Sequence, residues 1–407
     1  MMGERVGSQD RLFYEFCLED RIPGDHFLRK IDAVLDLSWL RSELAPYYSH
    51  TGCPSVDPEL LIRLLLVGYR YSIRSERRLC QEVELNLAYR WFCRLGLEDQ
   101  VPNHSTFSVN RHERFRDSDI LRTVFEEEVF GCMKAGLVGG EGFAVDASVI
   151  EADASRFARI KGAEVDWSEQ QLAHRMVRKF VETLESENPP LNPDQKPKAM
   201  PPTDPCAAWT VRGRHKVTFG YGLNYLMDME NSVVLDVEAT PTRISKEVDA
   251  AETMIERAEQ CFGLRPDRIA GDVAYGTGEM LGWLVDHEIT PHIPVWDQTE
   301  VAADGIYSRA EFSYDADQER RVQRDVNQEV RDYVQSLMGT DDYWHSTINR
   351  KQNERLFGEA KRHLSMTRLR LRGLTGARDE FLLTATVQNL KRLAKHVIRP
   401  PPRPIMA

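Results

Sequence analysis

The stretch from Arg350 to Arg372, RKQNERLFGEAKRHLSMTRLRLR, constrains the fold most, because its side chains sort into distinct faces when it is wound as an α-helix. At about 100° per residue, one narrow sector carries charges around a glycine: Arg350, Glu354, Gly358, Lys361 and Ser365. The opposite arc is apolar and must face a core: Leu356, Phe357, Ala360 and Leu364. Glu359 falls between the two arcs, where Arg355 and Arg362 are expected to pair with it.

The charged sector has two interpretations. The first is a solvated helix face with ordinary ion pairs, and the helix taken alone favours it. In the second, Glu354 ligates a metal ion, Gly358 clears room for a bulky ligand, and Arg350 and Lys361 grip a phosphate backbone. A basic run of three candidate DNA contacts follows the helix: Arg368, Arg370 and Arg372.

Charge and composition narrow the classes of partner. The net charge of −11 argues against wholesale coating of DNA, but residues 350–372 carry eight Lys/Arg against two Glu, a local charge of +6. No apolar run approaches the ~20 residues that span a bilayer. No signal-peptide core is evident at the start, and the seven cysteines are scattered without C-x2-C spacing. We therefore expect a cytoplasmic protein with reduced thiols, no zinc site and no membrane partner.

Residues 1–138 are predicted to be helical, because apolar residues recur at helical spacing and strand-like alternation is scarce. Asp57 and Pro58 mark the start of one helix. Two short helices with basic residues near the start of the second are compatible with a helix-turn-helix that contacts DNA. Its candidate contacts are Arg77, Arg78 and Arg111. The charged surface of a small helical bundle is equally compatible with the pattern.

Strand-like segments begin after Gly139-Gly140. Residues 143–150, FAVDASVI, form a β-prone segment interrupted by Asp146, and a buried carboxylate is costly unless it is paired or metal-bound. Residues 217–227 alternate as a half-buried strand and turn into a hairpin with VVLDVEAT. The run RIAGDVAYGT then ends a short strand at Asp272 just before a helix, a position where open α/β sheets bind ligands. A fifth strand is predicted at 289–295.

The spacing R-x3-E-x6-K at Arg350, Glu354 and Lys361, the run G-D-V-A-Y-G-T around Asp272 and the N-terminal segments P-S-V-D-P-E-L-L and P-N-H-S-T-F together resemble bacterial insertion-sequence transposases of the DDE class. The resemblance covers nearly the whole chain. It implies an α/β fold with an RNase H-like mixed sheet flanked by helices and preceded by an all-α domain. It also implies that Asp146, Asp272 and Glu354 are the catalytic carboxylates, holding two Mg²⁺ (or Mn²⁺) ions.

The same resemblance implies a domain organisation. Residues 1–138 would be a helical domain that binds DNA ends, and 139–398 an RNase H-like catalytic domain. Its insertions would lie at about 151–212 and 296–345, each with a charged helix, at 169–187 and about 318–338. A Pro-rich tail would occupy 399–407.

The implied function is a nucleoid-associated transposase that binds terminal inverted repeats and target DNA, works as a homodimer in a synaptic complex, and cleaves and transfers DNA strands. Two departures from the family pattern favour alternatives. Thr347 stands where relatives have a tyrosine, and no cysteine-rich segment precedes the glutamate helix. A degenerate or domesticated transposase that binds DNA without cutting it is one alternative, and an RNase H-like nuclease is another.

Overall fold

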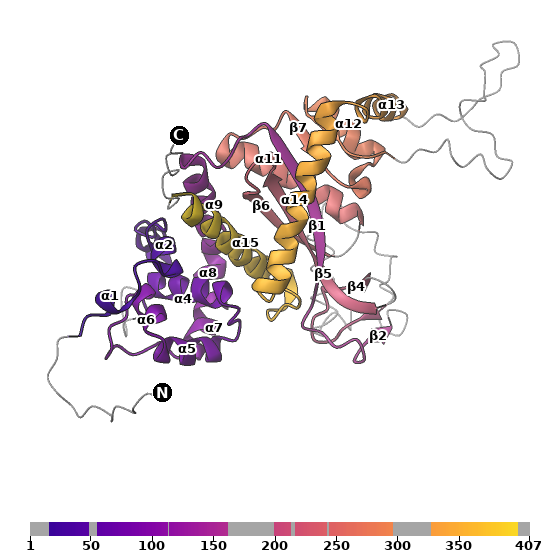
Figure 1. The fold of residues 1–407 in the computed structure, drawn as a ribbon. Helices are drawn as coiled ribbons and strands as arrows, with labels where there is room; N and C mark the ends of the chain where they lie inside the picture. Colours follow the sequence, from indigo (N-terminus) through magenta and orange to yellow (C-terminus); the bar gives the residue numbers. More distant parts are fainter. Residues whose placement is uncertain are drawn as a thin grey trace, which may run out of the picture.

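The computed structural model describes residues 16–48, 55–112, 114–161, 199–212, 216–241, 244–295 and 327–397 (Figure 1). A helical N-terminal part is followed by a mixed sheet with helices packed against it, which confirms the predicted fold class. No described helix has the length and apolar character needed to cross a membrane. The predicted helix at 169–187, the interval 296–326 and the tail at 399–407 lie outside the described residues.

The N-terminal part contains short helices joined by tight turns. Asp57 caps the helix that begins at Pro58 by accepting the backbone N–H of Glu59, and Pro58 takes its first position, as the sequence predicts. The helices are α1 (Leu18–Arg21), α2 (Phe27–Asp32), α3 (Leu40–Leu44), α4 (Pro58–Arg70), α5 (Glu76–Leu85), α6 (Leu87–Phe92), α7 (His104–His112), α8 (Arg114–Asp117) and α9 (Ile120–Lys134), with a 3₁₀ turn, η1, at Ala45–Tyr47.

The sheet runs in the order β4-β5-β1-β7-β8, with β6 on the same edge of β5 as β4. Its strands are β1 (Gly142–Glu151), β4 (Ala208–Arg212), β5 (Lys216–Asp228), β6 (Val234–Pro241), β7 (Arg268–Ala270) and β8 (Thr290–His292). The β1–β5 and β5–β6 pairs are antiparallel, whereas β1–β7 and β7–β8 are parallel. A small separate ladder joins β2 (Ile160–Lys161) to β3 (Ala199–Met200).

Two strand predictions need correction. The segment 217–227 was expected to be half-buried, but β5 is central in the sheet and almost wholly buried, because helices cover both of its faces. Its polar Asn224 is buried, and its amide Nδ2 donates to the Glu238 carbonyl and to Thr240 Oγ1 at 3.1 and 2.9 Å. The fifth strand, expected at 289–295, is only three residues long as β8.

The helices of the sheet domain are α11 (Ile244–Phe262), α12 (Gly278–Asp286), α13 (Gln328–Leu337), α14 (Asp341–His363) and α15 (Gly373–Val397), with a 3₁₀ turn, η4, at Val273–Tyr275. α15 lies between the N-terminal helices and the sheet (Figure 1). Its Asn389 exchanges hydrogen bonds with the backbone of Val234 on β6, at 2.9 and 2.8 Å. Its buried face belongs to one apolar cluster that continues from the N-terminal helices into the sheet.

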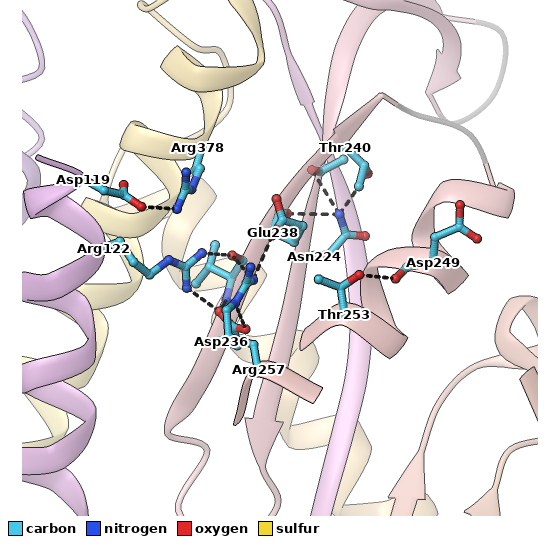
Figure 2. A network of polar contacts seen from close by, with 12 residues as sticks. Asp119, Arg122, Asn224, Asp236, Glu238, Thr240, Asp249, Thr253, Arg257 and Arg378 are labelled. Atoms are coloured by element: carbon cyan, nitrogen blue, oxygen red, sulfur yellow. Dashed lines mark hydrogen bonds and ion pairs between the residues drawn. The ribbon is translucent and has the colours of Figure 1, made fainter. Parts of the chain in front are cut away.

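Charged side chains also join the N-terminal part to the sheet (Figure 2). Arg122 on α9 is buried, pairs with Asp236 on β6 and donates to the Val237 carbonyl at 2.8 Å. Arg257 on α11 pairs with the same Asp236 at 2.6 Å. Because two cations share one buried carboxylate, α9 and α11 are both fixed to β6, and the N-terminal part cannot swing freely on the sheet.

Candidate active site

Asp146 lies in the middle of β1, where its Oδ1 accepts the backbone N–H of Ala147 at 2.8 Å. The pKa of this carboxyl is raised from 3.8 to about 6, first by burial and then by the negative charges of Asp272 and Glu354. The Ala147 hydrogen bond and the Arg350 guanidinium act in the opposite direction. Asp272, Glu354 and Arg350, which the sequence predicts to belong to the site, therefore all act on the charge of Asp146.

The register between β1 and β7 places Asp272 beside Asp146. β1 and β7 are parallel with Ala144 opposite Ala270, so Asp146 and Asp272 each follow the paired residues by two positions. Neighbouring strands are about 4.8 Å apart, and equivalent positions on them face the same way. Asp272 also caps the 3₁₀ turn η4, since its Oδ1 accepts the backbone N–H of Ala274 at 2.9 Å.

Glu354 is brought in by α14, which crosses β1 (Figure 1). The predicted apolar arc of this helix is buried: Leu356, Phe357, Ala360 and Leu364. Phe357 stacks on Tyr225 with ring centroids 5.0 Å apart, and Tyr225 is the strand partner of Asp146. Directly opposed residues of an antiparallel pair point to one face, so Asp146 faces α14. Glu354 itself is exposed.

The two cations of the predicted sector lie on either side of Glu354 along α14. Arg350 is half-buried and lowers the pKa of Asp146. Lys361 donates from Nζ to Ser148 Oγ, on the same face of β1 as Asp146 because the two positions differ by two. The helix thus packs on β1 with its charged sector toward the acidic residues.

Glu359 has other partners than those expected. It pairs with Lys391 and, at 3.9 Å, with Arg392, both on α15, rather than with Arg355 and Arg362 on its own helix. The sequence could not indicate this, because α15 approaches α14 only through the tertiary fold. Glu359 therefore joins two helices, and Glu354 is the acid of α14 whose charge acts on Asp146.

Two residues near the acids were missed by the sequence reasoning. Burial, and then the charges of Asp272 and Asp146, raise the pKa of Glu247 on α11 to about 7. The hydroxyl of Tyr275 is buried, has no hydrogen-bond partner among the described residues, and has a pKa raised first by burial and then by Glu247, Asp146 and Asp272. An acid in the first turn of a helix is common for dipole reasons alone, so Glu247 carried no usable signal.

The predicted DNA contacts differ in their accessibility. Arg370 is exposed; Arg368 and Arg372 are exposed but both pair with Asp153, at 3.0 and 2.8 Å. In the N-terminal part, Arg77 and Arg78 are exposed.

Arg111 needs correction as a candidate DNA contact. Its side chain is buried and pairs with Glu76 at 2.8 Å, so it connects α7 to α5 instead of facing solvent.

A groove of about 520 Å³ opens along α14 beside Glu354. Its lining includes four cations, one glycine and Glu354: Lys351, Arg355, Arg362, Lys391, Gly358 and Glu354. A Cβ placed on Gly358 would meet only the Arg362 guanidinium, at 3.7 Å, so the glycine keeps the groove floor low rather than relieving a clash.

Asp146, Asp272 and Glu354 have the ligand chemistry that a divalent cation needs, but their side chains are not arranged as a complete metal site. Among the described residues, no three His, Cys, Asp or Glu side chains lie close enough together to hold one ion. Their hard oxygens nevertheless suit Mg²⁺ and Mn²⁺. The pKa of Asp146 is raised first by burial and then by Asp272 and Glu354, and a bound cation would offset both effects. Asp146 and Asp272 each engage Oδ1 with a backbone N–H, which fixes the carboxylate and leaves Oδ2 for a ligand.

Asp146 in β1, Asp272 after the neighbouring parallel strand β7 and Glu354 on α14 follow the order of acidic residues that the resemblance to DDE transposases implies. The comparison with protein families agrees. A model described as "Transposase DDE domain" matches residues 139–390, and one described as "Transposase domain (DUF772)" matches residues 16–113. The chain belongs to the DDE transposases of insertion sequences, a family that generally uses divalent metal ions. No curated protein and no solved structure gave a significant match.

Proposed function

We propose that this transposase binds the inverted repeats at the ends of its own element and cuts and joins DNA strands there. Asp146, Asp272 and Glu354 would be the reactive carboxylates. One observation carries the proposal: the pKa of Asp146 is raised first by burial and then by the charges of Asp272 and Glu354, although the three residues come from a strand, a strand end and a late helix. Perturbed carboxylates clustered in this way are typical of functional sites.

Asp146, Asp272 and Glu354 would hold two divalent cations, which supply activation of water or of a free 3′-OH and stabilisation of the leaving oxygen. Asp146 and Asp272 would provide fixed oxygens, because backbone N–H groups hold their carboxylates in place. Glu354, which is exposed on a rigid helix, would complete the ligand set by a rotation of its side chain.

Arg350 and Lys361 would position the DNA backbone over the acids, since one modulates Asp146 and the other reaches β1 at Ser148. The groove beside Glu354 would take the strand that leads away from the reacting phosphate, because Lys351, Arg355 and Arg362 project into it. Phosphate contacts of this kind fix register on DNA without reading its sequence. A homodimer would bring two ends together.

The alternative of a transposase that binds DNA ends without cutting them is favoured by one observation. No ready group of three metal-ligating side chains exists among the described residues. Both functions would use the same DNA-binding surface, so only a direct test of DNA cutting distinguishes them.

The test uses DNA cloned from both flanks of the gene, with nicking measured in Mn²⁺ and binding measured by gel shift at several salt concentrations. Glu354→Gln should abolish nicking. Glu359→Gln, the matched change on the same helix, should leave it detectable, because Glu359 pairs with α15. Asp272→Asn should stop nicking but leave binding intact or slightly tighter, since it removes a negative charge near phosphates. Wild-type protein that binds its ends in Mn²⁺ and never nicks them supports the binding-only alternative.

Lys361→Ala and Lys351→Ala test the DNA path. Each should weaken binding to all sequences and lower the salt slope by about one unit, the behaviour of a phosphate contact. Lys30, on α2, is not one of the candidate DNA contacts and offers a control: Lys30→Ala should leave the slope unchanged. If Asp272→Asn lost DNA binding as severely as it lost nicking, Asp272 would have a structural role instead of a catalytic one.

A further inference from the structure

The turn that follows α4 in the N-terminal part contacts the segment 363–371, which directly follows the glutamate helix. Ser72 Oγ donates to the carbonyl of His363 at 2.7 Å. Arg74 donates from Nη1 to the carbonyls of Ser365 and Arg368, at 2.9 and 3.1 Å. The Arg74 side chain is only 4% exposed, so it is inserted between the two parts of the molecule.

Glu380 on α15 holds the same segment from the other side. It pairs with Arg74, and its Oε1 accepts the backbone N–H groups of Arg370 and Leu371 at 2.7 and 2.6 Å. Gly376 allows this close approach, since a Cβ there would lie 2.8 Å from the Leu371 Cβ. A buried guanidinium and a buried carboxylate thus satisfy four backbone groups of one loop between them.

The segment also touches the strand that carries Asp146. Leu369 donates its backbone N–H to the carbonyl of Glu151, the last residue of β1, at 2.7 Å, and Glu151 donates to the carbonyl of Thr367 at 3.2 Å. Ser72 and Ser365 both adopt positive φ, at 61° and 55°, a conformation that non-glycine residues rarely adopt unless their surroundings hold them there. Contacts from the turn after α4, from α15 and from β1 therefore meet at this loop.

We propose that Arg74 is a positioning residue for the transposase reaction. Through Glu380 it fixes the loop 363–371, and the loop in turn fixes the end of the glutamate helix and the basic run relative to β1. Its effect on cutting rests on the proposed function; its effect on the loop does not. The N-terminal part then contributes to the active site mechanically, in addition to any DNA it binds.

The discriminating variant is Arg74→Lys. Lysine keeps the charge that Glu380 needs, but a single ammonium cannot reproduce the fork of a guanidinium toward a carboxylate and two carbonyls. Arg63→Lys is the matched control. Arg63 lies on α4 and its side chain is also buried. Its guanidinium binds the carboxylates of Asp32 and Glu59 and the carbonyl of Phe92. None of these partners belongs to the loop, so the control reports the general cost of losing a buried fork.

Limited digestion with trypsin, well below the melting temperature, reads out the loop without DNA. Arg368 and Arg370 are exposed cleavage sites within it. Arg74→Lys should speed cleavage after these two arginines by about tenfold, the effect of ~1.4 kcal/mol of lost loop stability. Cleavage elsewhere should stay as in wild type. Arg63→Lys, at a comparable melting temperature, should leave cleavage in the loop unchanged.

Single-turnover nicking at saturating DNA supplies the second readout. Arg74→Lys should lower the nicking rate several-fold while the Kd for DNA stays within about twofold, and Arg63→Lys should change neither. If Arg74→Lys fails to fold, Ser72→Gly takes its place. It removes the bond to the His363 carbonyl, and glycine tolerates the positive φ. Its loop cleavage should rise without a lower melting temperature.

Three results would overturn the proposal. Loop cleavage equal to wild type in both Arg74→Lys and Ser72→Gly would mean that these contacts do not hold the loop. Cleavage that rises equally throughout the chain would reduce Arg74 to a general stabilising residue. A loosened loop with an unchanged nicking rate would show that the loop does not position the site. Wild-type protein that never nicks would refute the cutting function alone, because the trypsin readout would still decide the role of Arg74 in holding the loop.

Discussion

Replacing Asp146 by asparagine should stabilise the metal-free protein above pH 6 and remove most of the stabilisation that Mg²⁺ gives. The carboxyl has its pKa raised from 3.8 to about 6, first by burial and then by Asp272 and Glu354. Asparagine keeps an oxygen that can accept the Ala147 N–H, so the backbone contact survives. Only the charge is lost.

The sign follows from proton binding. Between about pH 4 and pH 6 the folded state keeps a proton on Asp146 that the unfolded state releases, so the free energy of unfolding falls as pH rises through this window. Above it, the ionised carboxylate costs the folded state on the order of 3 kcal/mol, from a pKa difference of about two units. At roughly 2–4 °C per kcal/mol for a domain of this size, Asp146→Asn should melt about 6–12 °C higher at alkaline pH.

The assay is thermal melting followed by circular dichroism at about pH 5 and about pH 8, in EDTA and in millimolar Mg²⁺. Wild type should gain stability from Mg²⁺ at the higher pH, because ligand that binds only the folded state stabilises it. Glu359→Gln is the control: it removes an acid of α14 that already pairs with Lys391, so it should not raise the melting temperature in EDTA. An Asp146→Asn protein that melts no higher than wild type in EDTA, or gains as much from Mg²⁺, would refute the reasoning.

Three further predictions concern stability. Burial raises the pKa of Glu128 to about 8, so stability should fall from about pH 4.5 to pH 8, and Glu128→Gln should remove this fall in urea unfolding curves. Arg122→Met should cost about 3 kcal/mol in the same assay, because it takes one of two cations from the buried Asp236. Gly276→Ala should lower the melting temperature and slow nicking, because its Cβ would lie 2.6 Å from the Pro294 carbonyl oxygen and displace the turn after the second aspartate. If any one of these variants gave the wild-type result, that result would contradict the role of the corresponding residue.

Local sequence patterns predicted those parts of the site that depend on local rules. The 3.6-residue period separated the buried Phe357 from the exposed Glu354 within one helix. Asp272 stood out because strand, acid and helix follow one another in a few residues, and the structure has the same order. Asp146 could be singled out because a carboxylate interrupts an apolar strand segment.

Residues whose roles depend on distant partners could not be found in this way. Arg74 lies a few residues before the exposed Arg77 and Arg78, and Arg111 was a candidate DNA contact, yet the side chains of Arg74 and Arg111 are buried and paired. The partner of Arg74, Glu380, is about three hundred positions further along the chain. Glu247 occupies an unremarkable first helical turn, and only the packing of α11 brings it near Asp272. Charge patterns reveal which residues are ionic, but the fold decides which of them face solvent.

The structure of α14 weakens one of the two departures from the family pattern, the missing tyrosine at position 347. Thr347, at the family's tyrosine position, donates its hydroxyl back to the carbonyl of Tyr343 at 3.0 Å. Tyr343 itself precedes Arg350 by seven residues, about 20° short of two full turns, so both lie on one face of the helix. Its ring is buried against His292, and its pKa is raised by burial and lowered by Arg350. The helix therefore still carries a tyrosine close to Arg350, one turn earlier than in relatives, and the substitution at Thr347 argues against cutting less strongly than the sequence alone suggests.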